Sequence, residues 1–227
     1  MSSISERAPG PEVLERLRRT LNVDWRRYSA LVAEKRGEGA FSVLVGVILS
    51  QNTNDRNSIK AFMNLKERVG VKLSDILEAN VDDIAEAIKP AGLWKQKAEA
   101  IKAAAETINA LGGEKFLLEE DPERLRDILL TVKGVGAKTV DVFLSVVRKA
   151  PFFAVDTHAM RIALRWGLSD KRSYDRVSRA LLEYFGPENA EEAHRLIISL
   201  GRTYCTARSP RCPECPLTDI CPSSLKH

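Results

Sequence analysis

The chain has no cysteine before residue 205, and this scarcity excludes one class of protein. All four cysteines of the 227 residues fall between Cys205 and Cys221. Small secreted domains that depend on disulfides spread a higher density of cysteines over a shorter chain. The cysteines are therefore not the framework of a disulfide-stapled fold.

Long apolar runs are also missing. The longest, residues 41–49, is far shorter than the ~20 apolar residues that a membrane-spanning helix needs. The N-terminal stretch MSSISERAPG has no apolar segment typical of a secretory signal. We therefore expect no membrane association and an intracellular protein, in the cytoplasm or nucleoid of a prokaryote, where thiols stay reduced.

Strand patterns are absent as well. No segment alternates convincingly between apolar and polar residues, and residues 151–155 are too few to form a sheet. Helix signals occur along nearly the whole chain. Asp121-Pro122-Glu123, for example, supplies a cap, a proline at the first helical position and an acidic first turn. The sequence therefore predicts an all-α fold.

Composition allows a nucleic-acid partner without requiring one. Hydrophobic residues make up 44% of the chain and charged residues 29%, as in an ordinary globular protein. The net charge is +4 and the isoelectric point is near 8.9. Basic residues gather around the cysteines, at Arg202, Arg208 and Arg211, and upstream of them, at Arg161, Arg165, Lys171 and Arg172.

The cysteines follow the spacing C-x6-C-x2-C-x5-C in a short loop rich in arginine and proline. Four thiolates in such a loop can surround one metal centre, so a metal site is favoured over a disulfide pair. Zinc with four cysteine ligands usually uses two C-x-x-C halves separated by a longer stretch. An iron–sulfur cluster accepts uneven spacings and is the preferred interpretation, while zinc remains open.

A glycine-containing turn separates two well-signalled helices between residues 121 and 148. Gly134 and Gly136 let the backbone turn tightly and approach another surface closely. The free N–H groups of this turn and of the next helix then form an anion site. This is the helix–hairpin–helix arrangement, which binds a DNA phosphate without reading sequence; an ordinary tight turn between helices is the alternative. Residues 88–101 weakly repeat this pattern of turn and lysine-bearing helix, as chance allows in an all-α chain.

Two side chains near the hairpin are candidates for catalysis. Lys138 falls in the first turn of the second helix, where the positive end of the helix dipole favours the neutral, nucleophilic amine. A phosphate-binding or solvated lysine is the alternative. Asp156 precedes a helical pattern and reads as an N-cap, a position that is compatible with a catalytic carboxylate. His158 is expected to support the site rather than to act as a base.

Together, K-G-V-G-A-K-T, V-D-T-H-x-x-R and the cysteine spacing resemble the endonuclease III family of DNA glycosylases, within the helix–hairpin–helix superfamily. The resemblance runs from about residue 30 to residue 221. It implies two helical lobes: a helical barrel over residues 33–150 with the hairpin at about 122–149, and an iron–sulfur domain made of residues 1–32 and 151–227. The implied ligands of a 4Fe–4S cluster are Cys205, Cys212, Cys215 and Cys221.

The resemblance also implies roles for single residues. Lys138 stands where bifunctional members keep the lysine that forms a Schiff base, and Asp156 matches the catalytic aspartate. Gln51 or Asn52 would fill the gap left by an extruded nucleotide, and Leu93 would wedge the opposite strand. The alternatives are a polar helix stop for the two amides and a core position for the leucine.

Further DNA contacts are implied for Gly134 and Gly136 in the hairpin and for Arg208 and Arg211 beside the cysteines. The chain departs from the family at two places. S-Q-N-T at 50–53 replaces the commoner S-A-Q-A-T, and Val-Lys replaces Leu-Pro before the first hairpin glycine. The first departure leaves open which amide side chain enters the gap.

The expected function is a bifunctional DNA glycosylase and abasic-site lyase of base excision repair that removes damaged, oxidised pyrimidines. The expected partner is double-stranded DNA containing a damaged base or an abasic site, bound by a monomer. Two alternatives remain: a thymine-mismatch or UV-dimer glycosylase on the same scaffold, and a non-enzymatic helix–hairpin–helix protein that only binds DNA. The second would give no reason for Lys138 and Asp156 to occur together.

Overall fold

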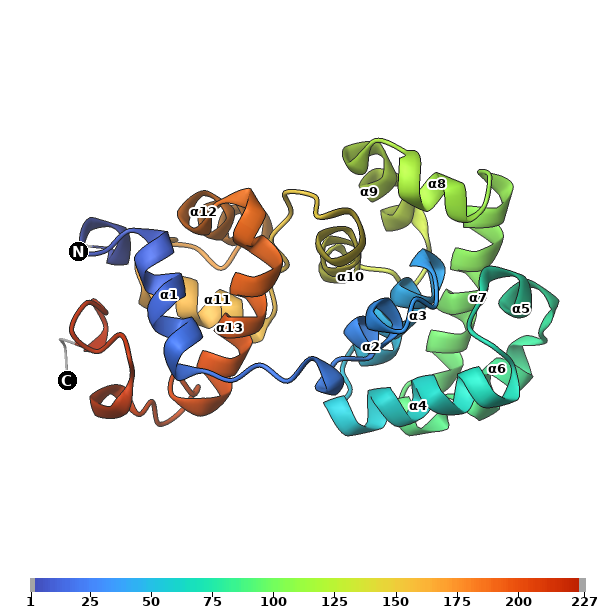
Figure 1. The fold of residues 1–227 in the computed structure, drawn as a ribbon, viewed down its shortest axis with the longest axis horizontal. Helices are drawn as coiled ribbons and strands as arrows, with labels where there is room; N and C mark the ends of the chain where they lie inside the picture. Colours follow the sequence, from blue (N-terminus) through green and yellow to red (C-terminus); the bar gives the residue numbers. More distant parts are fainter. Residues whose placement is uncertain (1–2, 225–227) are drawn as a thin grey trace. The chain divides into compact units, whose positions relative to one another are not determined.

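The computed structural model describes residues 3–224 and divides into two compact helical units (Figure 1). The central unit comprises residues 24–150, and the terminal unit combines residues 3–23 with residues 151–224. The described residues form helices and no strand, which confirms the all-α fold expected from the sequence. Among them, no helix combines the length and apolarity needed to cross a membrane.

The first boundary between the units lies at residue 24, whereas the sequence placed it at residue 33. The reason is the packing of α2 (Ser29–Lys35) on α3 (Ala40–Ser50). The Ser29 hydroxyl donates to the carbonyl of Gly46 at 2.7 Å. A Cβ at Gly46 would lie only 2.8 Å from the backbone of α2, so glycine permits this close approach. Residues 24–32 therefore belong to the central unit.

The central unit is built around α3, which is apolar on nearly every side. Its remaining helices are α4 (Asp55–Arg68), α5 (Leu73–Glu78), α6 (Val81–Ala87), α7 (Trp94–Ala110), α8 (Glu114–Glu119), α9 (Pro122–Thr131) and α10 (Ala137–Phe143). Residues 40–49 of α3 are all buried, because α2, α4, α7, α8 and α10 pack around them. A helix without a polar face is stable in water only when it is enclosed in this way. The loop that follows α3 therefore starts from a rigid position.

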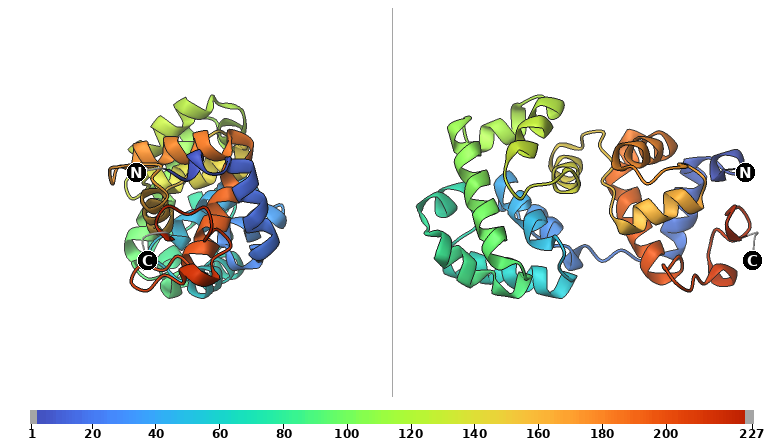
Figure 2. Two further views of the ribbon diagram at one scale, coloured as in Figure 1. Left: turned by 90° about the vertical axis from the view of Figure 1, so that its left-hand side faces the viewer. Right: turned by 180° about the vertical axis from the view of Figure 1, so that it is seen from behind.

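The terminal unit is assembled from segments at both ends of the described chain. Its helices are α1 (Gly10–Thr20), α11 (Thr157–Arg165), α12 (Tyr174–Phe185) and α13 (Ala190–Thr203). Both α1 and α11 pack against α12 and α13 (Figure 2). Phe153, Trp166 and Phe185 are almost fully buried in the core that these helices share. The core thus joins a helix from the start of the chain to three helices from its end.

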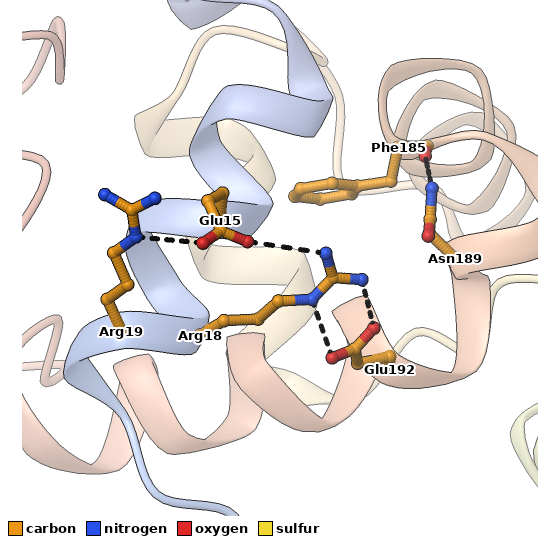
Figure 3. Close-up of polar contacts among 6 residues, drawn as sticks. All are labelled: Glu15, Arg18, Arg19, Phe185, Asn189 and Glu192. Carbon is orange, nitrogen blue, oxygen red and sulfur yellow. Dashed lines mark hydrogen bonds and ion pairs between the residues drawn. The ribbon is translucent and has the colours of Figure 1, made fainter.

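Ion pairs reinforce the attachment of α1 (Figure 3). Arg18 donates to both carboxylate oxygens of Glu192 on α13, at 2.9 and 2.6 Å. Glu15 pairs with Arg19 at 2.8 Å and with Arg18 at 3.6 Å. These side chains are partly exposed, and such pairs contribute at most about 1 kcal/mol each. Apolar burial is therefore the main force that holds α1 in the terminal unit.

Candidate active site and cysteine loop

A hollow of about 450 Å³ opens on the central unit beside the turn between α9 and α10. The loop after α3 forms part of its lining. The residues of the predicted site that line it are Gln51, Asn52, Gly134, Gly136 and Lys138. Two segments that are distant in the sequence therefore meet around one concave surface.

The two hairpin glycines serve different purposes. Gly134 has φ +86°, and a Cβ there would meet the Cβ of Ala100 on α7 at 2.9 Å. Gly136 has φ −103°, which any residue adopts, and no atom lies within 4 Å of its hypothetical Cβ. The tight turn requires glycine only at the first position. At Gly136 the missing side chain instead leaves the backbone open to an approaching ligand.

Lys138 lies in the first turn of α10 and is exposed. Its helix is fixed to the preceding one by a buried ion pair: Arg126 Nε on α9 donates to Asp141 Oδ1 on α10 at 2.7 Å. The Asp141 side chain is 1% exposed. Lys138 is therefore open to an approaching ligand, while the hairpin that carries it is firmly held.

Gln51 and Asn52 are adjacent in sequence but differ in their surroundings. The Gln51 side chain is half-buried and its Nε2 donates to the hydroxyl of Thr139, which directly follows Lys138. Asn52 is exposed and has φ +49°, in the left-handed region that asparagine tolerates better than most residues. Gln51 is therefore tied to the hairpin helix, whereas Asn52 occupies the tip of the loop.

Leu93 lies in a separate turn, before α7, and is not among the residues that line the hollow. Its side chain is 55% exposed and its φ is +48°, a strained value for leucine. The core position considered from the sequence is thus wrong for this residue. The neighbouring Trp94 ring has the ammonium groups of Lys89 and Lys95 at 5.5 and 5.1 Å from its centre. An exposed apolar tip beside two cations suits a negatively charged partner.

Asp156 belongs to the terminal unit, where it is the N-cap of α11. Its Oδ1 accepts the backbone N–H of Ala159 at 2.7 Å, and the side chain is half-buried. The positive end of the helix dipole favours the ionised carboxylate. Burial lowers the pKa of the nearby His158, although the charge of Asp156 opposes this shift. The Nδ1 of His158 lies 3.0 Å from Nη2 of Arg161, on the same helix.

The same helix holds the start of the cysteine loop. Arg161 donates to the carbonyl of Cys205 from Nε and Nη2, at 3.0 and 2.9 Å. Arg165 donates to Cys205 Sγ at 3.1 Å and to the carbonyl of Thr206 at 2.7 Å. Both arginines, which the sequence grouped with a basic surface, therefore serve to position the loop. Helix α11 carries the aspartate at one end and the loop contacts along its length.

All four cysteines line one cavity of about 180 Å³ in the terminal unit, and they are half-buried. Within residues 3–224, no three His, Cys, Asp or Glu side chains are close enough together to hold a single metal ion. A tetrahedral zinc site would require all four sulfurs at ~2.3 Å from one point. Cysteines spread around a wider cavity suit a core of several atoms, so the donor set fits an iron–sulfur cluster better than zinc.

Electrostatics of the cysteines support a bound cation. Burial raises the pKa of Cys215 to about 11 and also raises that of Cys221. Thiolates in such surroundings need positive charge, which metal ions supply when they deprotonate a ligating thiol. The Arg165 guanidinium adds a further positive charge beside Cys205.

The two arginines expected to contact DNA from this loop differ in availability. Arg211 donates to Glu214 at 3.0 Å and lies over the Tyr204 ring at 5.8 Å, so its guanidinium is already engaged on the surface. The pKa of Arg211 is raised, first by the hydrogen bond that it donates to Glu214. Arg208 is exposed, and its side chain makes no hydrogen bond or ion pair with any of residues 3–224. Arg208 is therefore the better candidate for a phosphate contact.

One polar cluster beside the site was not found by sequence reasoning. Lys97 on α7 is 4% exposed and bonds to Thr53 in the loop that carries Asn52. A signal existed: residues 88–101 repeat the turn and lysine-bearing helix of the hairpin. This repeat carries little weight by itself, because two similar helix–turn–helix units are expected by chance in an all-α chain.

Comparison with known proteins gives two family matches. Residues 45–187 match the HhH-GPD superfamily of base excision DNA repair proteins. Residues 205–221 match the iron–sulfur binding domain of endonuclease III, a span that starts and ends at the first and last cysteine. An endonuclease III from Sulfolobus acidocaldarius is 34% identical over 208 residues, which cover 91% of this chain and 92% of that protein.

Solved structures agree with these matches. A trapped covalent intermediate of endonuclease III with DNA has a TM-score of 0.74 and 26% identity, covering 100% of this chain and 99% of the other. A thermostable thymine-DNA glycosylase has the same fold, with a TM-score of 0.79, 18% identity and coverage of 98% and 100%. The chain thus belongs to the endonuclease III family of helix–hairpin–helix DNA glycosylases, which act in base excision repair, and its cofactor is a 4Fe–4S cluster.

Proposed function

We propose that this DNA glycosylase is also an abasic-site lyase and that it removes damaged pyrimidines, oxidised ones in particular, from duplex DNA. The main support is the position of Lys138 on the hollow that also presents the hairpin glycines and the loop after α3. Monofunctional adenine and mismatch glycosylases of the superfamily have another residue at this position. The covalent DNA complex of a related endonuclease III supports the same route.

In the proposed first step, the Lys138 amine attacks C1′ of the damaged nucleotide. The bond from C1′ to the base breaks, and the base leaves with the bonding electrons and takes up a proton. Asp156 accepts the proton that the lysine nitrogen loses, and as a carboxylate it stabilises the positive charge that develops on the sugar. The sugar ring then opens: the bond from C1′ to O4′ breaks, O4′ keeps its electrons and takes up a proton, and an iminium remains between C1′ and the lysine nitrogen.

The strand is cleaved in the second step. The iminium withdraws electrons from C2′, so a proton is lost there and its electrons form a double bond to C3′. The bond from C3′ to oxygen breaks, and the 3′ phosphate leaves. Water then hydrolyses the imine and regenerates Lys138. The cluster is assigned the structural role of shaping the loop that carries Arg208.

Binding to DNA is proposed to use both the hairpin and the exposed tips. The amides of Gly134, Gly136 and the first turn of α10 would receive a phosphate. Asn52 would enter the gap left by the extruded nucleotide, while Leu93 would wedge the opposite strand. A damaged base costs less free energy to extrude than a paired one, which contributes to selection of the lesion. A monomer is sufficient for all these contacts.

Borohydride trapping tests the lysine. The wild-type protein, incubated with an abasic duplex and borohydride, should form a stable protein–DNA adduct, and Lys138→Gln should abolish it. Lys133→Gln is the matched control, because Lys133 lies on the same hairpin and its side chain is 91% exposed. The proposal is wrong if Lys138→Gln still cross-links like the control, or if only Lys133→Gln loses the adduct.

The lesion is tested separately with duplexes that contain oxidised pyrimidine, uracil, mismatched thymine, a UV dimer or 8-oxoguanine. Fastest excision of oxidised pyrimidine supports the proposed substrate class. Fastest excision of mismatched thymine or of a UV dimer would replace it with the corresponding alternative. A wild-type protein that binds an abasic duplex without nicking it would lack the lyase activity, and one that also excises none of these bases would only bind DNA.

A further inference from the structure

The most unusual polar group in the central unit is the buried ammonium of Lys97. The side chain is 4% exposed, although it projects from α7 among apolar residues. Its Nζ donates three hydrogen bonds: to the carbonyl of Leu49 at 3.0 Å, to the hydroxyl of Thr53 at 2.6 Å and to the carbonyl of Ala91 at 2.9 Å. Three donors thus meet three acceptors, as a buried ammonium requires.

The three acceptors come from different segments. Leu49 is in the last turn of α3, and Thr53 is in the loop that follows it. Ala91 ends the short 3-10 turn that precedes Gly92. The Thr53 hydroxyl also donates to the carbonyl of Ala91, so the two loops are joined directly as well as through Lys97. One ammonium therefore fixes the bases of both loops to α7.

Both of these loops carry a strained residue at the tip. Asn52 has φ +49° and Leu93 has φ +48°, and of the non-glycine residues in the described chain only Lys149 shares such a value. Strained conformations persist only where surrounding contacts over-determine them. Asn52 lies between two of the segments that Lys97 binds, and Leu93 lies two residues after Ala91. The strained residues therefore lie beside the three hydrogen bonds of Lys97, which we call the Lys97 clamp.

A second lysine on the same helix shows what a purely structural version of this bonding is like. Lys102 Nζ donates to the carbonyls of Ile76, Leu77 and Ala79 at 3.1, 2.7 and 2.9 Å. All three acceptors belong to the C-terminal end of α5, so Lys102 caps one helix. Lys97 differs because it joins two loops, and each of these loops carries an exposed residue with a strained backbone.

We propose that Lys97 is a positioning residue that sets Asn52 and Leu93 at the spacing needed to enter an opened base pair. This inference rests on the proposed roles of the two tips in DNA. Lys97 does not touch the nucleotide; it acts by holding the two loop bases at a fixed separation. Its loss should therefore affect recognition of an extruded site much more than general affinity for duplex DNA.

The first experiment tests the clamp in the holoprotein without DNA. Amide hydrogen exchange is measured by mass spectrometry for wild type, Lys97→Met and Lys102→Met. Lys97→Met keeps the aliphatic stem and should accelerate exchange in residues 50–54 and 90–94 together by about tenfold or more, as expected when charge-assisted hydrogen bonds are lost. Lys102→Met should accelerate exchange at the end of α5 only. The clamp is overturned if Lys97→Met accelerates exchange in only one of the two loops or in neither. It is also overturned if Lys102→Met accelerates exchange in both loops.

The second experiment tests its use in recognition. The ratio of dissociation constants for an undamaged duplex and for one with a tetrahydrofuran abasic analogue is measured for the same proteins. Lys97→Met should lower this ratio by about tenfold while the affinity for undamaged DNA changes less than about twofold, and Lys102→Met should keep the wild-type ratio. An unchanged ratio in Lys97→Met, or an equal fall in both variants, overturns the positioning role.

Two further results keep the tests decisive. If Lys97→Met does not fold, Thr53→Val replaces it in both experiments, because this change removes the shared hydroxyl at a half-exposed position while keeping the side-chain shape. The same changes, smaller in size, support the clamp, and wild-type behaviour overturns it. If the wild type shows no preference for the abasic duplex, the proposed roles of the tips fail, and exchange alone decides whether Lys97 clamps the loops.

Discussion

The core of the central unit and the cysteine loop of the terminal unit are held in place by different interactions. The central unit encloses a helix, α3, whose residues 40–49 are all buried, and it adds polar contacts only at the rim of this core. The terminal unit attaches a loop of little apolar content to α11 through guanidinium groups and thiolates. Lys138 is in the first unit and Asp156 in the second. The core around α3 and the cysteine loop therefore depend on different kinds of stabilising interaction.

This difference indicates which changes each unit should tolerate. Apolar burial is non-directional, so the central unit can repack around modest changes in its core. Contacts between guanidinium and carbonyl groups require exact partners, and a cluster requires all of its thiolates. Loss of one contact or thiolate in the cysteine loop should therefore have a severe but local effect. Substitutions in the core around α3 should instead lower the stability of the central unit in steps that follow the size of the change.

Removal of the cluster should have the largest effect. After oxidation and chelation of iron, hydrogen exchange in residues 205–221 should approach that of an unfolded chain, because few apolar side chains remain to order the loop. Exchange in residues 40–49 should stay as slow as in the mock-treated holoprotein. Base excision should be lost. Two outcomes would refute this contrast. One is an equal acceleration of exchange in α3, and the other is slow exchange in residues 205–221 after the iron has been removed.

Asp156→Asn should follow, with a fall in excision rate of about 10³-fold, because asparagine still caps α11 but cannot accept a proton. Asp121→Asn is the matched control in the central unit. Asp121 caps α9 in the same way, with its Oδ1 accepting the N–H of Arg124 at 3.0 Å. Single-turnover kinetics should show wild-type excision for this control. Equal losses in both variants would mean that capping, not the charge of Asp156, matters.

Breaking the buried ion pair of the hairpin should have a graded effect. Arg126→Met leaves the buried Asp141 carboxylate without its 2.7 Å partner and should lower the free energy of unfolding by about 3 kcal/mol. Arg124→Met, also on α9, removes an ion pair to Glu120 at the end of α8 and should cost less than about 1 kcal/mol. Urea unfolding of the holoproteins measures both. Similar losses of unfolding free energy in the two variants would show that the buried ion pair does not stabilise the hairpin.

The smallest expected effect is on the pH dependence of the central unit. Burial lowers the pKa of Lys97 from 10.5 to about 8. Between these values the unfolded chain holds a proton that the folded chain has released, so stability rises with pH through this window. From pH 7 to pH 9 the gain should be about 1 kcal/mol. Urea unfolding of wild type should show this gain relative to Lys97→Met, and parallel profiles would contradict it.

Local chemistry sets some helix ends, and the sequence located the start of α9 for this reason. Asp121 caps α9 as predicted, and α12 ends at Gly186, whose φ of +84° suits glycine. The helices α3 and α4 were not identified individually. An apolar run such as residues 41–49 shows no helical periodicity when every face is buried, so its pattern does not distinguish a helix from a buried strand. The first unit boundary lies at residue 24 in the structure and was expected at residue 33, because packing of α2 on α3 leaves no local signal.

The site was harder to predict than the fold. The hairpin pattern selected Gly134, Gly136 and Lys138, and the resemblance to the endonuclease III family added Gln51 and Asn52; all five line the hollow. Their catalytic and DNA-binding roles stay predictions. Burial of Lys97 and the hydrogen bonds of Arg161 to the cysteine loop could not be predicted from the sequence. Both depend on backbone carbonyls that tertiary packing brings close, and the residue type does not show whether a basic side chain faces water or a carbonyl.

The assembly of the terminal unit from both ends of the chain affects the order of events during synthesis. Helix α1 leaves the ribosome long before α12 and α13, the helices that cover its apolar face, exist. The central unit, by contrast, is contiguous and has all of its partners once residue 150 has emerged. The nascent protein therefore acquires the lysine-bearing unit first, exposes α1 to chaperones meanwhile, and becomes ready for iron only when its last segment is released.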